Sequence, residues 1–196
     1  NVQHTIRGFE AVGIAAIQIE DQEFPKKCGH TLGRRVIDAA DMVEKIKVAC
    51  DARQDPNFLI IARTDSRTAL GLDEAIDRAG AYQAAGADVL FVEAPESEEE
   101  FAKIAASIDA PLLANMVEGG RSPILSRERL AALGFALAIY PGTGFTAAAA
   151  ALEQAYRCIR DTGSTDTLQV PLYPVTEMHK LMGFESVWDF EKKWTK

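Results

Sequence analysis

The feature that most constrains the fold is the alternation of short apolar runs with longer amphipathic segments. Five runs have the length and composition of buried strands, at residues 13–19, 58–62, 88–92, 111–114 and 135–139. Between them, apolar residues recur every three or four positions, which is the spacing of an amphipathic helix. Strands that alternate with helices form parallel sheets, so the sequence predicts an α/β fold.

The segments between the strands predict a regular series of helices. We expect helices over residues 2–12, 41–54, 72–85, 97–108 and 146–160, then a loop over 163–176 and a helical tail over 178–194. Gly86 and Gly134 stand where two helices should end, since glycine readily adopts the left-handed conformation of a helix C-terminus. We therefore predict a partial barrel in residues 1–162 and a C-terminal loop and tail in residues 163–196.

Polar residues follow the predicted strands directly. Glu20, Arg63, Glu93 and Asn115 each stand at or just after the end of an apolar run. Active sites of parallel α/β proteins form at the carboxyl ends of the strands, so these side chains should converge. Five strands fit either an eight-stranded barrel without its first three βα units or an open, doubly wound sheet. Periodicity leaves both architectures open.

Composition and charge exclude several classes of function. The chain has 196 residues, of which 47% are hydrophobic and 26% charged, as in ordinary soluble domains. The net charge of -8 argues against nucleic-acid binding, which needs clustered Lys and Arg. No stretch approaches the roughly 18 apolar residues of a membrane span, and residues 1–7 are no signal peptide. The three cysteines lack metal-ligand spacing, and we expect a cytoplasmic protein.

The run IEDQEFPKKCGH at residues 19–30 resembles the loop after the fourth strand of isocitrate lyases, methylisocitrate lyases and their relatives. The motif order continues with Ala-Arg-Thr-Asp at 62–65, Phe-Val-Glu-Ala at 91–94, Ala-Asn-Met at 114–116 and Tyr-Pro at 140–141. Over essentially its whole length, the chain is similar to the isocitrate lyase and phosphoenolpyruvate mutase superfamily.

The resemblance implies a (β/α)₈ TIM barrel, of which residues 1–162 would carry strands four to eight. It also implies a homotetramer whose subunits exchange the C-terminal helical tail, and a Mg²⁺ ion for which Mn²⁺ could substitute. The family's Asp-x-Asp pair that holds this ion belongs to the first three strands and has no counterpart here. Glu20 would lie beside the metal and bind it through water. The ligand would be a small hydroxy- or oxo-carboxylate, with neither nucleic acid nor membrane as a partner.

In this family the cysteine of the Lys-Lys-Cys-Gly-His motif donates a proton to carbon, which implies that role for Cys28. Lys26 and His30 would support its charge, since cationic neighbours make a thiol reactive. Outside such a motif, a lone cysteine is more often a small buried hydrophobe. Glu93 would contact this catalytic cluster. The 23–35 segment has the Gly and Lys content of a mobile loop and, by resemblance, closes over the substrate.

Arg63 would hold a substrate carboxylate, which a guanidinium can grip with two parallel hydrogen bonds. The alternative for Arg63 is a structural salt bridge to Asp65 or Glu93. Asn115 would bind the distal carboxylate of the substrate. By resemblance, the full set of substrate contacts is Cys28, Gly29, Arg63, Glu93, Asn115, Met116, Val117 and Pro141.

Two positions bear on the substrate. Methylisocitrate lyases carry an arginine for a third carboxylate where this chain has Thr146, which disfavours a tricarboxylate. The run NMVEGG at 115–120 is similar to that of 2,3-dimethylmalate lyase, oxaloacetate hydrolase and the petal death protein, which act on dicarboxylates.

The resemblance implies a Mg²⁺-dependent lyase that cleaves the C2–C3 bond of a 2-hydroxy di- or tricarboxylic acid, of the 2,3-dimethylmalate or methylisocitrate type. Retro-Claisen chemistry would give a 2-oxo acid and a carboxylic acid. Three alternatives stay open: an oxaloacetate hydrolase, a carboxyphosphonoenolpyruvate phosphonomutase, and a truncated homologue without catalytic activity.

Overall fold

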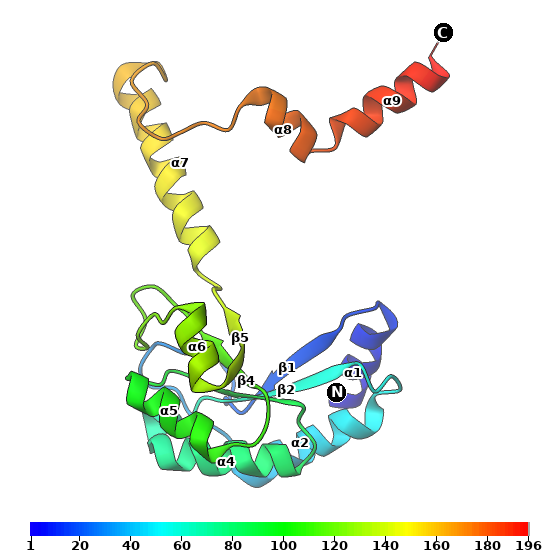
Figure 1. Cartoon of the computed structure of the whole chain (residues 1–196), viewed down its shortest axis with the longest axis vertical. Coiled ribbons are helices and arrows are strands. Elements are labelled where there is room, and N and C mark those ends of the chain that lie inside the picture. The colour runs from blue at the N-terminus through cyan, green and yellow to red at the C-terminus, as the bar shows by residue number, and fades with distance from the viewer. Residues whose placement is uncertain (196) are drawn as a thin grey trace. The chain divides into compact units, whose positions relative to one another are not determined.

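The computed structural model describes residues 1–195, and its five strands form one parallel sheet (Figure 1). The strands are β1 (Ala16–Glu20), β2 (Leu59–Thr64), β3 (Val89–Val92), β4 (Leu112–Asn115) and β5 (Phe135–Ile139). Their order in the sheet is their order in the sequence. A doubly wound sheet reverses direction and carries helices on both faces. The uninterrupted order is instead that of a barrel wall, which confirms the barrel-type α/β fold.

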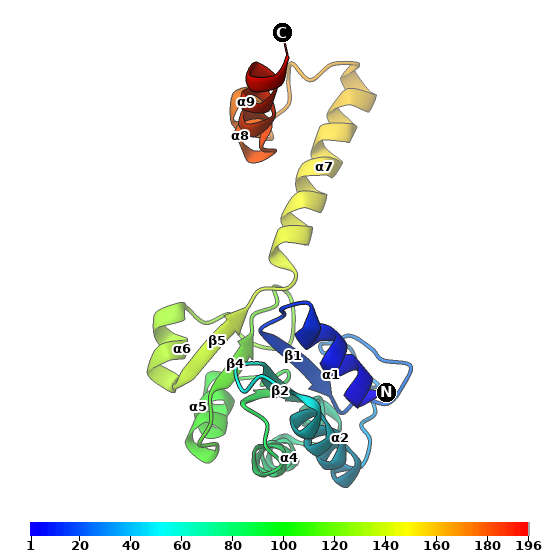
Figure 2. The same ribbon diagram turned by 90° about the vertical axis from the view of Figure 1, so that its right-hand side faces the viewer.

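Helix α1 precedes β1, the other helices of the sheet region follow strands, and the helices lie along one side of the sheet (Figures 1 and 2). They are α1 (Val2–Ala11), α2 (Ala39–Ala52), α3 (Arg67–Leu70), α4 (Leu72–Ala84), α5 (Glu98–Ser107) and α6 (Arg127–Leu133). Right-handed crossovers between successive neighbouring strands put every connecting helix on the same face. The other face of the sheet and the carboxyl ends of the strands are therefore left for loops and polar side chains.

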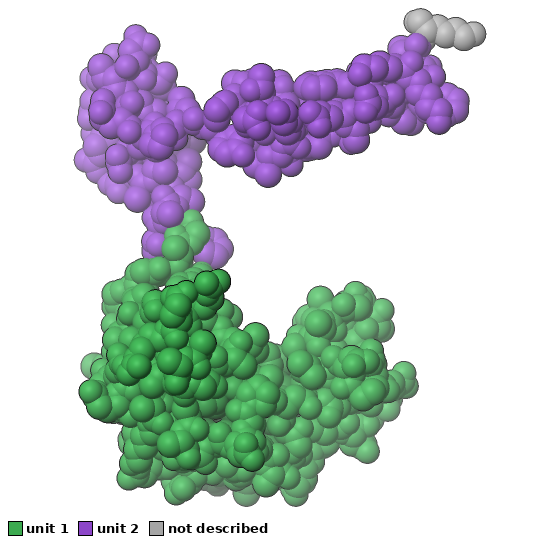
Figure 3. Space-filling view, in the orientation of Figure 1, with its two compact units in different colours: residues 1–144 green, residues 145–196 purple. Residues whose placement is uncertain are grey.

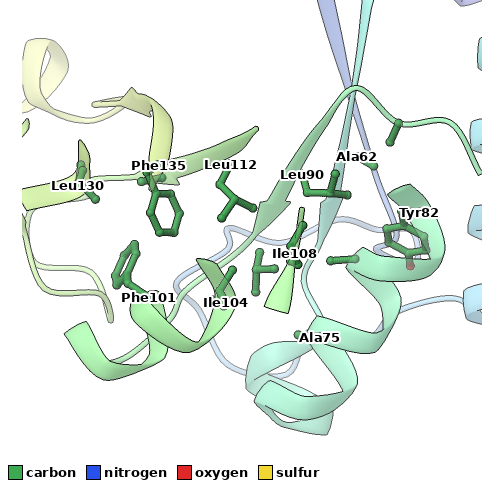
Figure 4. Close-up of a cluster of buried hydrophobic side chains, with 14 of the residues drawn as sticks. Ala62, Ala75, Tyr82, Leu90, Phe101, Ile104, Ile108, Leu112, Leu130 and Phe135 are labelled. Carbon is green, nitrogen blue, oxygen red and sulfur yellow. The ribbon is translucent and has the colours of Figure 1, made fainter. Parts of the chain in front are cut away.

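Side chains of the strands alternate between two faces, because successive residues of a strand point in opposite directions. On the face toward the helices, Ala62, Leu90 and Leu112 belong to the main core together with Tyr82 and Phe101 (Figure 4). On the opposite face, a smaller cluster joins Val89, Phe91 and Leu113, with Ile61 packed against it. The second face is the one that would line the inside of a barrel.

The contacts within the chain divide it into two compact units, residues 1–144 and 145–196 (Figure 3). The division after residue 144 comes near the start of α7 (Thr143–Thr162), whereas the sequence predicted a boundary after residue 162, the last residue of that helix. Beyond it come α8 (Val175–Leu181) and α9 (Phe184–Trp194). No helix within residues 1–195 combines the length and the apolar content that crossing a membrane requires.

The predicted helices are found with shifts of a few residues at their ends, and three features differ from expectation. Helix α6 was anticipated only by its end at Gly134, without a predicted range. The four-residue helix α3 was not predicted, because so short a segment carries no periodic signal. The tail expected to be helical over 178–194 is two helices, separated at Gly183, whose φ of 76° no helix interior allows. Gly134 ends α6 with a φ of 97°, as predicted.

Candidate active site

Four polar side chains meet at the carboxyl ends of the strands. Glu20, Arg63 and Asn115 are the last or next-to-last residues of β1, β2 and β4, and Glu93 directly follows β3. Glu20 and Arg63 are direct partners in the β1–β2 register. Arg63 is two positions after Ile61 in β2, so both side chains point to the same face of the sheet. The Arg63 guanidinium lies over the Phe91 ring, with 4.9 Å from its carbon to the ring centroid. The group therefore occupies the face away from the helices.

A pocket of about 330 Å³ opens at this end of the sheet. It is lined by Lys26, Cys28, Gly29, His30, Arg63, Asn115, Val117, Pro141 and Gly142. The first four of these belong to the 22–36 loop, which connects β1 to α2. An antiparallel bridge between Gln22 and Val36 closes the base of this loop. The fold thus brings the Lys-Lys-Cys-Gly-His motif together with strand-end residues distant in sequence.

Arg63 is held by several carboxylates. Its Nε and Nη2 donate to Asp65 at 2.8 and 2.9 Å, and Nη2 lies 3.2 Å from Glu93 Oε2. Burial lowers the pKa of Arg63, but hydrogen bonding to Asp65 and the charge of Glu93 outweigh it, so the net shift is upward. Nη1 donates to no residue in the described part of the chain. The salt bridge considered from the sequence is therefore present, and Arg63, which lines the pocket, keeps one nitrogen without a partner in that range.

Glu93 is fully buried at the centre of this cluster. The Asn115 amide nitrogen lies 3.1 and 3.3 Å from its two oxygens. His30 Nδ1 accepts the backbone N–H of Arg121 at 3.0 Å, so in the neutral ring the proton is on Nε2. His30 Nε2 lies 3.0 Å from Glu93 Oε1, although the angle is too bent for a hydrogen bond. Glu93 thereby links the strand-end arginine to the loop histidine.

Gly29 permits this close approach of the loop. A Cβ added at Gly29 would stand 2.7 Å from two side-chain carbons of Glu93 and would collide with the Arg63 guanidinium. Neither neighbour can give way easily, because both are fixed by ion pairs in the buried cluster. Gly29 is therefore required by the space at this position, which its resemblance to the family motif did not reveal.

The surroundings of Glu20 bear on whether the site could hold the implied magnesium ion. Its Oε2 is 2.8 Å from Lys26 Nζ and 3.5 Å from Arg63 Nε. The second oxygen has no hydrogen-bond partner among residues 1–195, which suits a hydrogen bond to a water on a hard cation. No group of three His, Cys, Asp or Glu side chains in that range could hold a metal ion. Glu20 thus fits a role through water, and the direct ligands would be other oxygen atoms.

The structure brings the predicted site residues together, but three of them, Glu20, Glu93 and Met116, do not line the pocket. Lys26, Cys28, His30 and Arg63 line the pocket, as do Gly29, Asn115, Val117 and Pro141. Glu20 and Glu93 lie behind them, each bonded to lining residues. The Met116 side chain is buried on the helix-facing side, where its sulfur accepts the Leu125 N–H at 3.4 Å. Met116 points away because it directly follows Asn115, and neighbouring residues alternate in direction.

Three buried charged residues, Asp21, Arg34 and Asp65, support the site, and of these only Asp65 was considered from the sequence, as a salt-bridge partner of Arg63. Asp21 accepts hydrogen bonds from Thr64, Tyr82 and the backbone N–H of Asp65 at 2.8 to 2.9 Å. Asp65 binds both Arg63 and Arg34. Burial raises the pKa of Asp65, but hydrogen bonding to Arg63 and the charges of Arg63 and Arg34 leave it below its usual value. Acidic residues directly after strand-end positions were the available signal.

Comparison with known proteins agrees with this geometry. Residues 1–160 match the family described as phosphoenolpyruvate phosphomutase. The chain is 44% identical to 2,3-dimethylmalate lyase of Eubacterium barkeri over 97% of its own length and 66% of that protein. It is also 44% identical to 2-methylisocitrate lyase of Aeropyrum pernix, over 98% and 61% of the two lengths. The chain thus spans somewhat under two thirds of these relatives.

Solved structures give the same result. A crystal structure of 2,3-dimethylmalate lyase matches with a TM-score of 0.88 at 30% identity, over 98% of this chain and 64% of that one. Phosphonopyruvate hydrolase in complex with oxalate and Mg²⁺ matches with a TM-score of 0.83 at 30% identity, over 100% and 68%. The chain therefore belongs to the phosphoenolpyruvate mutase and isocitrate lyase superfamily.

Proposed function

We propose that this chain carries the proton donor and a carboxylate ligand of a Mg²⁺-dependent lyase acting on a 2-hydroxy di- or tricarboxylic acid. The observation that carries the proposal is the pocket in which Cys28, Lys26 and His30 face Arg63. The thiol of Cys28, the nitrogen groups of Lys26 and His30, and the Arg63 guanidinium suit an anionic substrate that must be protonated at carbon. The similarity to 2,3-dimethylmalate lyase and 2-methylisocitrate lyase supports the same reaction class.

The reaction breaks one carbon-carbon bond and moves two protons. A general base takes the proton of the C2 hydroxyl, C2 becomes a carbonyl, and the electron pair of the C2–C3 bond passes into the carboxylate attached to C3. The resulting enediolate takes a proton at C3 and becomes a carboxylic acid, while the C2 fragment leaves as a 2-oxo acid. When bound, Mg²⁺ would supply Lewis-acid stabilisation of the negatively charged oxygens.

The residues of this chain divide the work by position. Cys28 delivers its proton to C3, and the cationic Lys26 and the polar His30 stabilise the thiolate that remains. Arg63 offers Nη1 to a substrate carboxylate, because Asp65 and Glu93 already occupy its other nitrogens. Buried Glu93 orients Arg63 and Asn115 rather than reacting, and Glu20 orients Lys26.

A substituted malate is the substrate that we favour within this class. Thr146 is neutral at the position where, by resemblance, methylisocitrate lyases bring an arginine to a third carboxylate. The 115–120 run, whose Asn115 and Val117 line the pocket, is similar to that of enzymes for dicarboxylates. Equal identities of 44% to a dimethylmalate lyase and a methylisocitrate lyase keep the tricarboxylate in the test.

Oxaloacetate hydrolysis is the second candidate. It is supported by a structure of oxaloacetate acetylhydrolase with 3,3-difluorooxalacetate, which matches with a TM-score of 0.88 at 30% identity. That reaction also cleaves the bond between C2 and C3, but attack by water on C2 replaces the loss of a hydroxyl proton. The products would be oxalate and acetate instead of a 2-oxo acid and a carboxylic acid.

The test is an assay of the intact protein with Mg²⁺ and each of 2,3-dimethylmalate, 2-methylisocitrate, isocitrate and oxaloacetate. Release of a 2-oxo acid from one hydroxy acid supports the lyase and names its substrate. Oxalate from oxaloacetate alone would replace the lyase by the hydrolase. No product from any of the four would contradict both and favour phosphonomutase chemistry or a non-catalytic homologue.

We also propose a homotetramer in which the C-terminal helices cover a neighbouring subunit. The support is that α7, α8 and α9 contain no buried residue and expose large apolar side chains such as Tyr156 and Trp194. Light scattering on the intact protein would give four times the monomer mass, and a monomeric mass would contradict the proposal.

A further inference from the structure

Arg34 is a buried arginine on the same loop that carries Cys28. Its side chain is 1% exposed, and its Nη1 donates to Asp65 Oδ1 at 2.7 Å. Its Nη2 donates to Thr68 in the short helix α3. The neighbouring Arg35 is of the same type but 74% exposed, and it pairs with Glu23 on the loop itself. Arg34 thus attaches the 22–36 loop to the segment after β2, and Arg35 does not.

Asp65 is shared between this loop arginine and the arginine of the pocket. Its Oδ1 accepts from Arg34 Nη1 and from Arg63 Nη2, at 2.7 and 2.9 Å, and its Oδ2 accepts from Arg63 Nε at 2.8 Å. The Asp65 side chain is completely buried, so no water takes the place of either arginine. The bidentate contact that orients Arg63 is therefore made by a carboxylate that is itself fixed by the loop.

The charges of the cluster balance only when the loop is docked. Three carboxylates, those of Glu20, Asp65 and Glu93, lie within 3.5 Å of Arg63. Two of the three compensating cations, Lys26 and Arg34, come from the loop. Without them Arg63 alone would face three negative charges, and an anionic substrate would be repelled. Docking of the loop thus changes the affinity of the site for carboxylates as well as its enclosure.

We propose that Arg34 is a positioning residue that couples docking of the 22–36 loop to the orientation of Arg63, through the Asp65 carboxylate that both arginines bind. The coupling rests on the proposed function, in which Arg63 is a carboxylate ligand. Arg34 is not among the residues that line the pocket. It makes the carboxylate-binding state of Arg63 depend on the presence of the loop.

The test compares Arg34→Gln with Arg35→Gln, a matched control one residue away. Hydrogen exchange would be measured over residues 23–35, and the Kd for oxalate by calorimetry in the presence of Mg²⁺, both on the intact protein. Arg34→Gln should speed exchange in the loop and raise the Kd at least about tenfold, since it removes a buried charge-assisted hydrogen bond. Arg35→Gln should leave both unchanged within about twofold, as exposed pairs contribute little.

Two further variants keep the test decisive if Arg34→Gln does not fold. Arg34→Lys retains one donor for Asp65 and should restore part of the oxalate affinity. Thr68→Val removes the second partner of Arg34 without altering Asp65, so it should speed loop exchange with a smaller rise in Kd.

Faster loop exchange with an unchanged Kd in these variants would overturn the coupling and leave Arg34 as a loop anchor only. Equal effects of the Arg34 and Arg35 variants would also overturn it. Absence of oxalate binding in the unmodified protein would overturn it too, by removing Arg63 as a carboxylate ligand. Because these measurements need no turnover, a failed lyase assay would contradict the proposed function separately.

Discussion

The two units of this chain have similar helical sequences and very different surroundings. In residues 1–144, large side chains such as Tyr82, Phe101 and Leu90 are at most 1% exposed. In residues 145–196, Tyr156 and Trp194 are 68% and 65% exposed, and no helix there buries a single described residue. Amphipathic periodicity predicts which face of a helix is apolar, but a helix buries that face only against a second surface. The first unit supplies that surface within itself.

The sharpest test of this contrast exchanges one sulfur for oxygen in each unit. Cys28→Ser should lower kcat by about 10²- to 10⁴-fold with little change in KM, because a hydroxyl is a far weaker proton donor than a thiol. Cys158→Ser, in α7, should leave kcat unchanged. Steady-state kinetics with the substrate that the proposed assay identifies would measure both. A comparable loss of kcat for Cys158→Ser would show that the second unit takes part in the chemistry.

Truncation of one aromatic side chain in each unit should separate their contributions to stability. Phe101 is 1% exposed and packs edge-on against Phe135 with ring centroids 5.2 Å apart. Phe101→Ala should lower the free energy of unfolding by about 3–5 kcal/mol. Trp188, 41% exposed, contacts only His179 and Phe184 among the described aromatic residues, so Trp188→Ala should cost much less. Urea unfolding at low protein concentration is the measurement, and an equal cost would mean that another surface covers α9.

A buried and an exposed carboxylate should differ in their pH dependence. Asp65→Asn should lower the free energy of unfolding by about 3 kcal/mol at pH 7, because it removes the negative charge that pairs with the buried Arg34 and Arg63. Folding lowers the Asp65 pKa, so its stabilisation is present above the unfolded value of about 4 and is lost as pH falls through the folded value. The difference between the variant and the unmodified protein should therefore shrink below about pH 4.

The matched carboxylate in the second unit is Asp189, which pairs with Lys192 at 3.0 Å with both side chains over 70% exposed. Asp189→Asn should leave the free energy of unfolding unchanged at every pH, since solvent screens such a pair. Urea unfolding over a pH series would show both behaviours. A loss for Asp65→Asn that stays constant below pH 4 would contradict the assigned ion pair.

The smallest expected effect concerns helix ends. Ser97 caps α5 by accepting the Glu100 N–H at 3.3 Å, whereas α8 and α9 have no side-chain cap. Ser97→Ala should therefore cost about 1 kcal/mol. Ser186→Ala, in the first turn of α9, removes only a bond back to the Gly183 carbonyl and should cost less. Thermal unfolding of the two variants would compare them.

Much of the fold could be predicted because it depends on local signals. The five strands follow from short apolar runs, and α6 ends at Gly134 because only glycine easily adopts the conformation required there. The order of the strands could not be predicted, since periodicity is the same in a barrel and in a doubly wound sheet. The break at Gly183 was missed because one glycine inside a helical pattern does not by itself exclude a helix.

The residues that line the pocket were predicted from the sequence, whereas most of the buried ion pairs that hold them in place were not. The lining residues came from a motif resemblance, and their roles there stay predictions. The support depends on pairs far apart in sequence: Arg34 meets Asp65 across 31 positions, and Tyr82 meets Asp21 across 61. A single sequence carries no signal for such pairs. The depth of Met116, by contrast, was predictable from strand alternation alone.

The alternation of side chains along the strands separates the residues of the pocket from those of the core. Glu20, Arg63 and Asn115 point away from the helices, while their immediate neighbours Ile19, Ala62 and Ala114 belong to the main core or pack against it. Selection can therefore replace the first set to change a reaction without disturbing the packing that keeps the domain folded. Its relatives include lyases, hydrolases and a mutase, a range of reactions that such a separation between pocket-facing and core-facing strand positions would allow.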